Sequence, residues 1–220
     1  RHYGVNVVPI AGAGAAGGMM DILGYPYCKG RLMTHLEEDH GQYDEVSPIF
    51  WATGACLLIR TQVYKEIGGL DANFFAHQEE IDLCWRIWNA SKWDRESEIG
   101  CIMSLPQAVI YHVGGGTLGY ENPRKTFLNF RNNLLMLRKN LPASRLWWVM
   151  LIRFFMDYAA ALQMLLTKQI SNAKAVFQAR WAYHKMKKQY PISQYQLQIA
   201  NNLLCKRSIV FDFYIRKQKK

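Results

Sequence analysis

The chain has 220 residues, half of them hydrophobic and 13% aromatic, which is enough for one large domain with a packed core. Its net charge of +10 is uneven, because residues 1–140 carry 13 Lys and Arg against 15 Asp and Glu, whereas residues 141–220 carry 14 against 2. This asymmetry predicts a mildly acidic globular part followed by a basic segment with an anionic partner. The five cysteines are odd in number and lack CxxC spacing, which argues against a zinc site or a disulfide framework and favours a reducing cytosol.

The first part of the chain alternates between ordered and irregular patterns. Residues 5–10 are a β-branched run that predicts a buried strand. Residues 11–21 are rich in glycine but lack the Lys-Ser/Thr of a phosphate loop, so they predict a flexible loop that lets backbone approach a ligand or another segment. Residues 22–47 are rich in turn formers and charge and predict an irregular, exposed excursion. The chain begins without methionine and reads as the middle of a longer protein.

An apolar run and a short helix follow. Residues 50–59 are nearly continuous in apolar character and predict a buried strand or strand pair. Thr61 is a natural N-cap, and Gly68 and Gly69 form a C-terminal stop, so residues 62–67 are expected to be helical. The chain then enters its most crowded acidic stretch.

The stretch FFAHQEEIDLCWR, residues 74–86, places three carboxylates within four positions among apolar side chains. Glu79, Asp82 and Arg86 have the spacing of one helix face, whereas the apolar residues from 81 to 87 alternate as in a strand. A carboxylate crowded by like charge and aromatic walls has a raised proton affinity, as a general base at neutral pH requires. A solvated helix start with an ordinary Asp–Arg pair is the alternative, and the spacing leaves both open.

Residues 90–98 are polar and predict a loop, and residues 99–103 and 107–113 predict short strands. The second strand ends at His112, directly before three glycines. A histidine there is a candidate metal ligand or phosphate contact, because the glycines leave space beside it. A purely structural histidine is the alternative.

The surest helix begins at Asn122 and Pro123, a cap-and-first-turn signature. Its apolar residues are spaced by three and four positions and are Phe127, Phe130, Leu134, Leu137 and Leu141. Five basic side chains lie on the opposite face: Arg124, Lys125, Arg131, Arg138 and Lys139. They are either solvated charge, or Lys125 and Arg131 turn inward toward an anionic ligand.

Beyond Pro142 the chain is apolar but is interrupted by Arg153 and Asp157. The longest uncharged run, residues 158–167, is short of the ~20 residues that a spanning helix needs. The pattern predicts two amphipathic helices that lie on a bilayer, with packing against a partner subunit as the alternative.

Three aromatic side chains are expected to enter the lipid: Trp147, Trp148 and Phe154. The basic segments that follow would be attracted to an anionic leaflet. Because apolar stripes accompany this charge, the region suits lipid better than a nucleic acid, and we expect no nucleic-acid partner.

Four segments together, GACLLIR, GGLDANFFAHQEEIDLCWR, VIYHVGGGTLG and NPRKTFLNFRNNLLMLRKNLP, resemble the C-terminal half of a family 2 glycosyltransferase of the rhamnosyltransferase-like type common in Bacteroidetes. The resemblance implies an α/β GT-A sandwich that moves a sugar from a nucleotide-diphosphate donor to an acceptor hydroxyl with inversion. Residues 1–141 would form the acceptor and base side of that domain, and residues 142–220 a basic amphipathic helical tail.

The resemblance also implies roles for single residues. Glu80 occupies the second acidic position of the family's FFxxxEDxDLxxR pattern, which supplies the catalytic base, although the usual ED is EE here. The residues expected to support this segment are Glu79, Asp82 and Arg86. Those expected near the donor diphosphate or metal are His112, Lys125 and Arg131, and those on the acceptor side are Gly54, Ala55 and His77.

The family's nucleotide-binding half, with its DxD-type acidic motif for Mg²⁺ or Mn²⁺, is not in this sequence. The chain is therefore expected to be a fragment, inactive by itself, of an enzyme at the cytoplasmic face of the inner membrane. Expected partners are a nucleotide sugar, a saccharide or lipid-linked acceptor and an anionic membrane, with a second copy of the chain as a further candidate. The alternative is a noncatalytic, membrane-recruited assembly module derived from a transferase.

Overall fold

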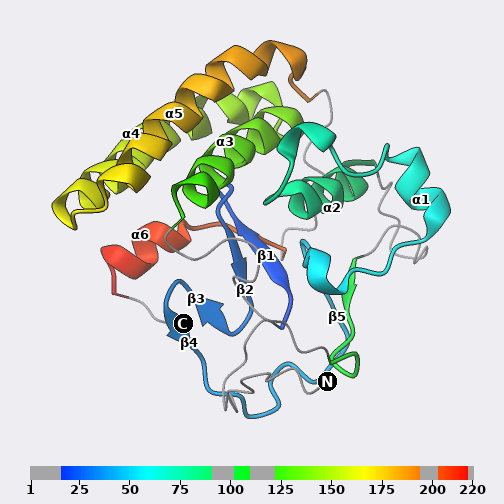
Figure 1. Ribbon diagram of the computed structural model, residues 1–220. Helices are drawn as coiled ribbons and strands as arrows, with labels where there is room; N and C mark the ends of the chain where they lie inside the picture. The colour runs from blue at the N-terminus through cyan, green and yellow to red at the C-terminus, as the bar shows by residue number, and fades with distance from the viewer. Residues whose placement is uncertain (1–15, 91–101, 110–121, 194–202, 218–220) are drawn as a thin grey trace, which may run out of the picture. The chain divides into compact units, whose positions relative to one another are not determined.

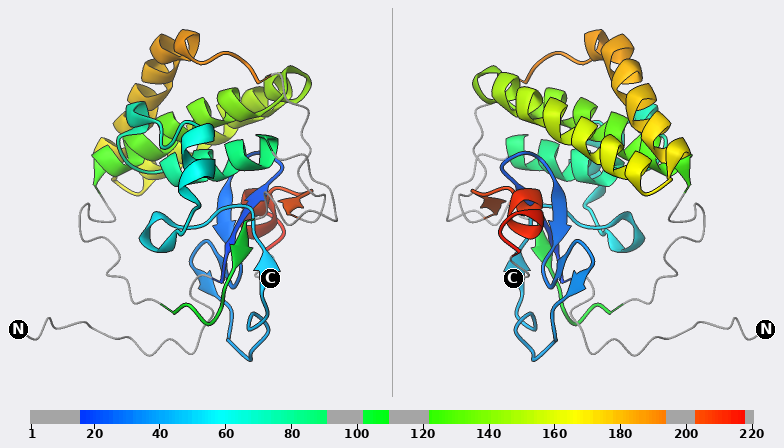
Figure 2. Two further views of the ribbon diagram at one scale, coloured as in Figure 1. Left: turned by 90° about the vertical axis from the view of Figure 1, so that its right-hand side faces the viewer. Right: turned by 90° about the vertical axis from the view of Figure 1, so that its left-hand side faces the viewer.

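The computed structural model describes residues 16–90, 102–109, 122–193 and 203–217, which form a mixed α/β structure (Figures 1 and 2). They fall into two compact units. The first contains the described residues up to 57 together with 102–109 and 203–217, and the second contains 58–90 and 122–193. This division follows compactness alone, so the functional boundary expected between residues 141 and 142 stays a prediction.

The first unit is built on a five-stranded sheet with the strand order β4-β3-β2-β1-β7. Its strands are β1 (Gly18–Asp21), β2 (Pro26–Cys28), β3 (Arg31–Leu32), β4 (His35–Leu36) and β7 (Leu204–Cys205). All neighbours are antiparallel except β1 and β7, which are parallel. A separate antiparallel pair joins β5 (Ser47–Pro48) to β6 (Met103–Ser104), and α6 (Ile209–Tyr214) follows β7.

Strand β1 is the centre of this unit and corrects the loop predicted for residues 11–21. Gly18 exchanges backbone hydrogen bonds with residues 50 and 51, and a Cβ on Gly18 would lie 2.2 Å from the Trp51 ring. The expected close approach of glycine backbone to another segment therefore occurs, but inside a strand. The buried Asp21 carboxylate ends the strand by accepting from the amides of Leu23, Tyr25 and Ile209.

Two neighbouring predictions were partly or wholly wrong. Residues 22–47 contain the short strands β2 to β4 and the first residue of β5 and are half-buried in places, so only part of this segment is irregular and exposed. The buried strand predicted over residues 50–59 does not form. Phe50 is buried, but the chain then makes an exposed 3₁₀ turn at Gly54–Cys56, and Leu58 is 97% exposed. Trp51 still pairs with Gly18, but residues 52–59 are in no strand, and apolar character alone does not bury a segment without a sheet partner.

The second unit is helical. Its helices are α1 (Thr61–Glu66), α2 (Glu79–Ala90), α3 (Pro123–Asn140), α4 (Ala143–Leu166) and α5 (Ile170–Met186). The predicted short helix is confirmed as α1, although Arg60 rather than Thr61 is at the cap position. Gly68 and Gly69 end it with φ of 84° and 65°, as the predicted stop requires. The ambiguous acidic stretch is helical from Glu79.

Helix α3 is the core of this unit, and Asn122 caps it as predicted by accepting from the Arg124 amide at 2.9 Å. It packs on α2, α4 and α5, and the three long helices lie side by side (Figures 1 and 2). The predicted apolar residues Leu134, Leu137 and Leu141 are buried. Three asparagines of α3 that are not among these predicted apolar residues are buried as well: Asn132, Asn133 and Asn140.

The two charges that interrupt the apolar helix α4 are buried. Arg153 is 2% exposed and its Nε lies 3.3 Å from Asp157 Oδ1, and Asp157 also pairs with Arg180 of α5. The prediction that Arg153 and Asp157 interrupt a lipid-facing apolar segment was therefore wrong, because both side chains face α3 and α5. Helix α4 is long and apolar enough to cross a membrane, but the core helices of soluble proteins can have the same length and composition.

Several predictions fall outside the described residues: the strand over residues 5–10, nearly all of the loop over 90–98, and the end of the strand over 107–113 with His112. Of the two strands expected around Pro106, the structure shows β6 at Met103–Ser104. Residues 107–109 are not in a strand.

Candidate active site

The segment before α2 has an unusual backbone path. Asp71 starts a 3₁₀ turn at Ala72–Phe74. Phe75, His77 and Gln78 then have φ of 65°, 68° and 72°. Left-handed backbone at a non-glycine residue costs about 1–3 kcal/mol and persists only where the surroundings enforce it. Contacts from elsewhere in the second unit must therefore hold residues 74–78, which we call the turn segment.

Helix α3 supplies these contacts. Asn132 is fully buried, and its side-chain nitrogen donates to the carbonyl oxygens of Phe74, Ala76 and His77 at 2.8–2.9 Å. The guanidinium of Arg131 also donates to the Phe74 carbonyl, at 3.2 Å. Two neighbouring side chains of α3 thus satisfy carbonyl groups that a left-handed path turns away from any helix or sheet.

The turn segment presents the first residues of α2. Glu79 and Glu80 are half-buried in the first turn, where the helix dipole stabilises negative charge by about 0.3–1 kcal/mol each. Within the described residues, Glu79 Oε2 and His77 Nε2 are buried without a hydrogen-bond partner. Buried polar atoms are nearly always satisfied, so two such atoms close in sequence mark a place where a ligand or water completes the site.

The third carboxylate of the cluster is neutralised by the protein itself. Asp82 is fully buried and accepts from Arg86 Nε at 2.8 Å, Lys139 Nζ at 2.9 Å and Asn140 Nδ2 at 2.8 Å. Arg86 also donates to the carbonyls of Ile67 and residue 69 after α1. The alternative of an ordinary Asp–Arg pair thus describes Asp82.

Burial and nearby charges shift the pKa values of two residues here, His77 in the turn segment and Asp71 before it. Burial lowers the pKa of His77, the charge of Lys125 lowers it further, and Glu79 opposes the shift. Burial alone would raise the pKa of Asp71, but its hydrogen bond to Lys139 and the charge of that ammonium lower the pKa below its ordinary value. His77 is therefore neutral at pH 7 and Asp71 is ionised.

The two basic residues of α3 that the sequence assigned to the donor diphosphate differ. The charge of Lys125 contributes to lowering the pKa of His77. Arg131 donates from Nε to Asn132 Oδ1 at 2.9 Å, and its guanidinium lies 5.2 Å from the centre of the Phe127 ring. The contacts of Arg131 are thus structural ones, and its role at a donor stays a prediction, as does that of Lys125.

The remaining site predictions concern other parts of the chain. Gly54 and Ala55 form an exposed 3₁₀ turn in the first unit, and their place on the acceptor side stays a prediction. His112 lies outside the described residues. Within the described residues, no group of three or more His, Cys, Asp or Glu side chains is placed to hold a metal ion.

Sequence reasoning missed Asn132 and Asn133. Neither was a candidate site residue in the sequence, yet both are buried and contact the turn segment. The available signal was the polar pair itself, because it lies beside the predicted apolar stripe at Leu134 and asparagine is a poor helix former. The partners of the two asparagines lie in the turn segment, 55 to 58 positions away, so local sequence pattern could not predict them.

Comparison with known proteins places the chain among distant relatives of glycosyltransferases. It is 23% identical over 148 residues to an N-acetylglucosaminyl-diphospho-decaprenol L-rhamnosyltransferase of Mycobacterium tuberculosis, an alignment that covers 67% of this chain and 44% of that protein. It is 27% identical over 95 residues to the low-salt glycan biosynthesis hexosyltransferase Agl10 of Haloferax volcanii, covering 43% and 29%. The chain thus spans less than half the length of these relatives. No family model and no solved structure matches.

Proposed function

We propose that this chain is the acceptor and base side of an inverting family 2 glycosyltransferase with a GT-A fold, and that Glu80 is its general base. The observation that carries the proposal is the pair Glu79–Glu80, presented at the start of α2 by a turn segment that α3 holds in a left-handed path. The relationship to sugar transferases supports the same chemistry.

The reaction we propose needs few groups from this chain. The Glu80 carboxylate takes the proton of an acceptor hydroxyl, whose oxygen attacks the anomeric carbon of the donor as the bond to the nucleotide diphosphate breaks. The departing diphosphate carries the charge that develops, and a Mg²⁺ or Mn²⁺ ion held elsewhere in the full-length enzyme would stabilise it. Neutral His77 is suited to contact an acceptor hydroxyl without repelling the adjacent Lys125.

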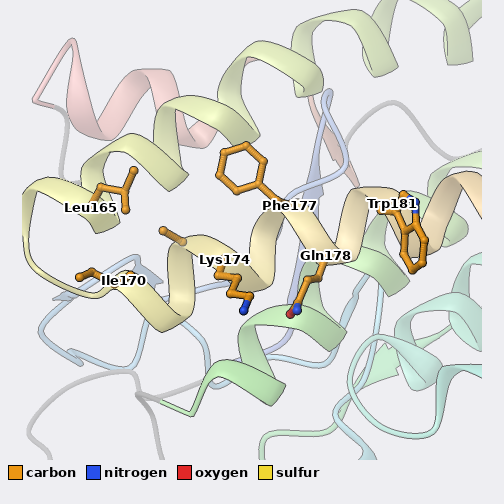
Figure 3. A pocket seen from close by; sticks show the side chains of 7 residues that line it. Leu165, Ile170, Lys174, Phe177, Gln178 and Trp181 are labelled. Carbon is orange, nitrogen blue, oxygen red and sulfur yellow. The ribbon is translucent and has the colours of Figure 1, made fainter.

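The acceptor we propose is a saccharide on a lipid carrier, and the membrane contact is the outer face of α4 and α5. That face exposes large apolar side chains, with Trp147 66%, Phe155 65% and Trp181 63% exposed, while the charges of Arg153, Asp157 and Arg180 are buried. A groove of about 520 Å³ opens on α5 beside the end of α4 (Figure 3). Its lining is mostly apolar and includes Leu165, Ile170, Phe177 and Trp181, with Lys174 and Gln178 at one side.

Charge supports an anionic bilayer as the partner of this face. No acidic residue occurs between Asp157 and Asp212, a stretch that carries eight Lys and Arg. Each basic residue near an anionic leaflet contributes about 1 kcal/mol of attraction. We place the enzyme at the cytoplasmic face of the inner membrane on this ground.

Transfer activity tests the proposed function. The full-length protein, incubated with Mn²⁺, a panel of nucleotide sugars and a polyprenyl-diphosphate saccharide, is expected to release nucleotide diphosphate and extend the acceptor. No transfer with any donor, together with no binding of any nucleotide sugar by calorimetry, would contradict the proposal and favour a noncatalytic assembly module.

Vesicle binding tests the membrane contact separately. We expect sedimentation with vesicles containing anionic lipid, and weaker sedimentation after Trp147→Ser combined with Phe155→Ser. Leu58→Ser is the matched control, because Leu58 is exposed but lies outside α4 and α5. Equal binding by all three proteins would contradict the contact.

A further inference from the structure

A line of buried polar side chains joins the turn segment to the paired charges of α4 and α5. Asn133 donates from Nδ2 to Gln78 Oε1 at 3.2 Å and accepts through Oδ1 from Arg153 Nη1. Arg153 pairs with Asp157, and Asp157 pairs with Arg180. Asn133, Arg153, Asp157 and Arg180 are all at most 5% exposed. The residue directly before Glu79 is thus tied to charges inside the helix bundle.

Asn132 holds the same segment from its backbone side. The two hydrogens of one amide group serve three carbonyl oxygens, those of Phe74, Ala76 and His77. Arg131 Nε in turn donates to Asn132 Oδ1 at 2.9 Å, which fixes the orientation of the amide. Neither hydrophobic packing nor helix propensity accounts for a fully buried asparagine in the middle of α3.

We infer that Asn132 and Asn133 are positioning residues for Glu79 and Glu80. The inference rests on the proposed function, because it concerns the same carboxylates. The left-handed residues His77 and Gln78 directly precede α2, so any relaxation of the turn segment moves the first turn of that helix. A displacement of about 1 Å at a reacting group is enough to lower a rate by up to about 100-fold.

A purely structural role is the competing explanation, since loss of any buried hydrogen-bonding side chain destabilises a fold. Asn172 of α5 provides the matched control. It is also a buried asparagine, at 6% exposed, and it accepts from Thr126 Oγ1 and donates to Gln169 Oε1, two partners that lie outside the turn segment. Asn132→Ala and Asn172→Ala are thus chemically identical changes, but only Asn132→Ala removes the hydrogen bonds of Asn132 to the turn segment.

Hydrogen exchange of the full-length protein tests the inference without reference to activity. The reporting amides are those of Ala76, which donates to the Phe74 carbonyl, and Asp82, which donates to the Gln78 carbonyl. We expect Asn132→Ala to accelerate their exchange at least about tenfold and to leave amides of α5 within about twofold of wild type. Asn172→Ala is expected to leave the amides of Ala76 and Asp82 unchanged. If Asn132→Ala accelerated exchange of the α5 amides as much as exchange of the Ala76 and Asp82 amides, the inference would be overturned.

Gln78→Ala is the second variant, because it cuts the Asn133 contact without touching the core and so folds even if Asn132→Ala does not. It is expected to accelerate exchange of the Asp82 amide alone, and unchanged exchange there would overturn the role of Asn133. In the transfer assay both variants should lower kcat by about 10- to 100-fold, with the KM for donor unchanged. Loosened amides with unaltered kcat in an active enzyme would overturn the positioning role, whereas a wild-type protein without transfer activity would instead refute the proposed function.

Discussion

The ammonium of Lys139 on α3 lies 2.9 Å from the buried carboxylate of Asp82 on α2 and 2.8 Å from that of Asp71 before the turn segment. One cation therefore joins both ends of the segment that presents Glu79 and Glu80. The relationship explains how a crowded acidic sequence is held at low cost, because the fully buried carboxylate of this sequence has two cationic partners.

Removing this cation should destabilise the second unit. Lys139→Met keeps the aliphatic stem but leaves Asp82 with Arg86 and Asn140 as its remaining donors. Because an interaction of a fully buried charge is lost, we expect the free energy of unfolding to fall by about 2–3 kcal/mol, measured by urea titration. Lys174→Met, at an exposed position of α5, is the control and should change it by less than about 0.5 kcal/mol. A loss at Lys139 no larger than at Lys174 would show that the ion pairs contribute nothing.

The pKa of Asp71 predicts a pH dependence. Burial would raise this pKa, but Lys139 lowers it below the ordinary value of 3.8. A lowered carboxyl pKa stabilises the fold above pH ~4, and this contribution disappears as the pH falls through the folded-state pKa. Asp71→Asn should therefore unfold more easily than wild type at pH 7, with the difference vanishing near pH 2. Asp44→Asn, at an exposed position, should show no such difference, and a gap for Asp71→Asn that persists at pH 2 would contradict the linkage.

Lys125 should control the titration of His77. Its charge adds to burial in lowering the pKa of His77, so Lys125→Met is expected to move that pKa back toward 6.5. The histidine resonances, assigned with His77→Gln, give the pKa by NMR titration. Arg124→Met removes the neighbouring exposed cation and is expected to leave the pKa unchanged. Since the folded-state pKa is lowered, His77 reduces stability as the pH falls below 6.5, and Lys125→Met should weaken that slope.

The end of α4 offers a stabilising change. Lys168 has φ of 61°, and its amide and that of Gln169 bond back to Leu165 and Met164. This is the position at which glycine is preferred after a helix, so Lys168→Gly should raise the free energy of unfolding by about 0.5–1 kcal/mol. The same substitution at Lys174, inside α5, should lower it by about 1 kcal/mol. Calorimetric melting measures the stability of both variants. A loss of stability in both would contradict the assignment of Lys168 as the position after α4 at which glycine is preferred.

Local pattern predicted the elements whose signals lie within one turn or one helix. The Asn122 cap, the stop at Gly68 and the apolar spacing of α3 each act over a few residues, and each was correct. Glu80 was reached through resemblance, and the structure shows it half-buried in the first turn of α2 without testing its role.

Pairings distant in sequence could not be predicted. Arg153 and Asp157 read as interruptions of a lipid-facing run because their partners, Asn133 and Arg180, lie 20 and 23 positions away. The run over residues 50–59 read as a strand because nothing local shows that its pairing with another strand ends at Trp51. Buried polar contacts depend on the fold as a whole, and such contacts hold the turn segment of the candidate site in place.

The central claim is that Glu80, rather than Glu79, takes the proton from the acceptor, and a pair of isosteric variants of the full-length enzyme tests it most directly. Single-turnover transfer by Glu80→Gln should be slower than wild type by about 10²- to 10⁴-fold, with the Kd for nucleotide sugar unchanged. Glu79→Gln should remain within about tenfold of wild type. Transfer by Glu80→Gln at more than a tenth of the wild-type rate, or a larger loss in Glu79→Gln, would contradict the assignment.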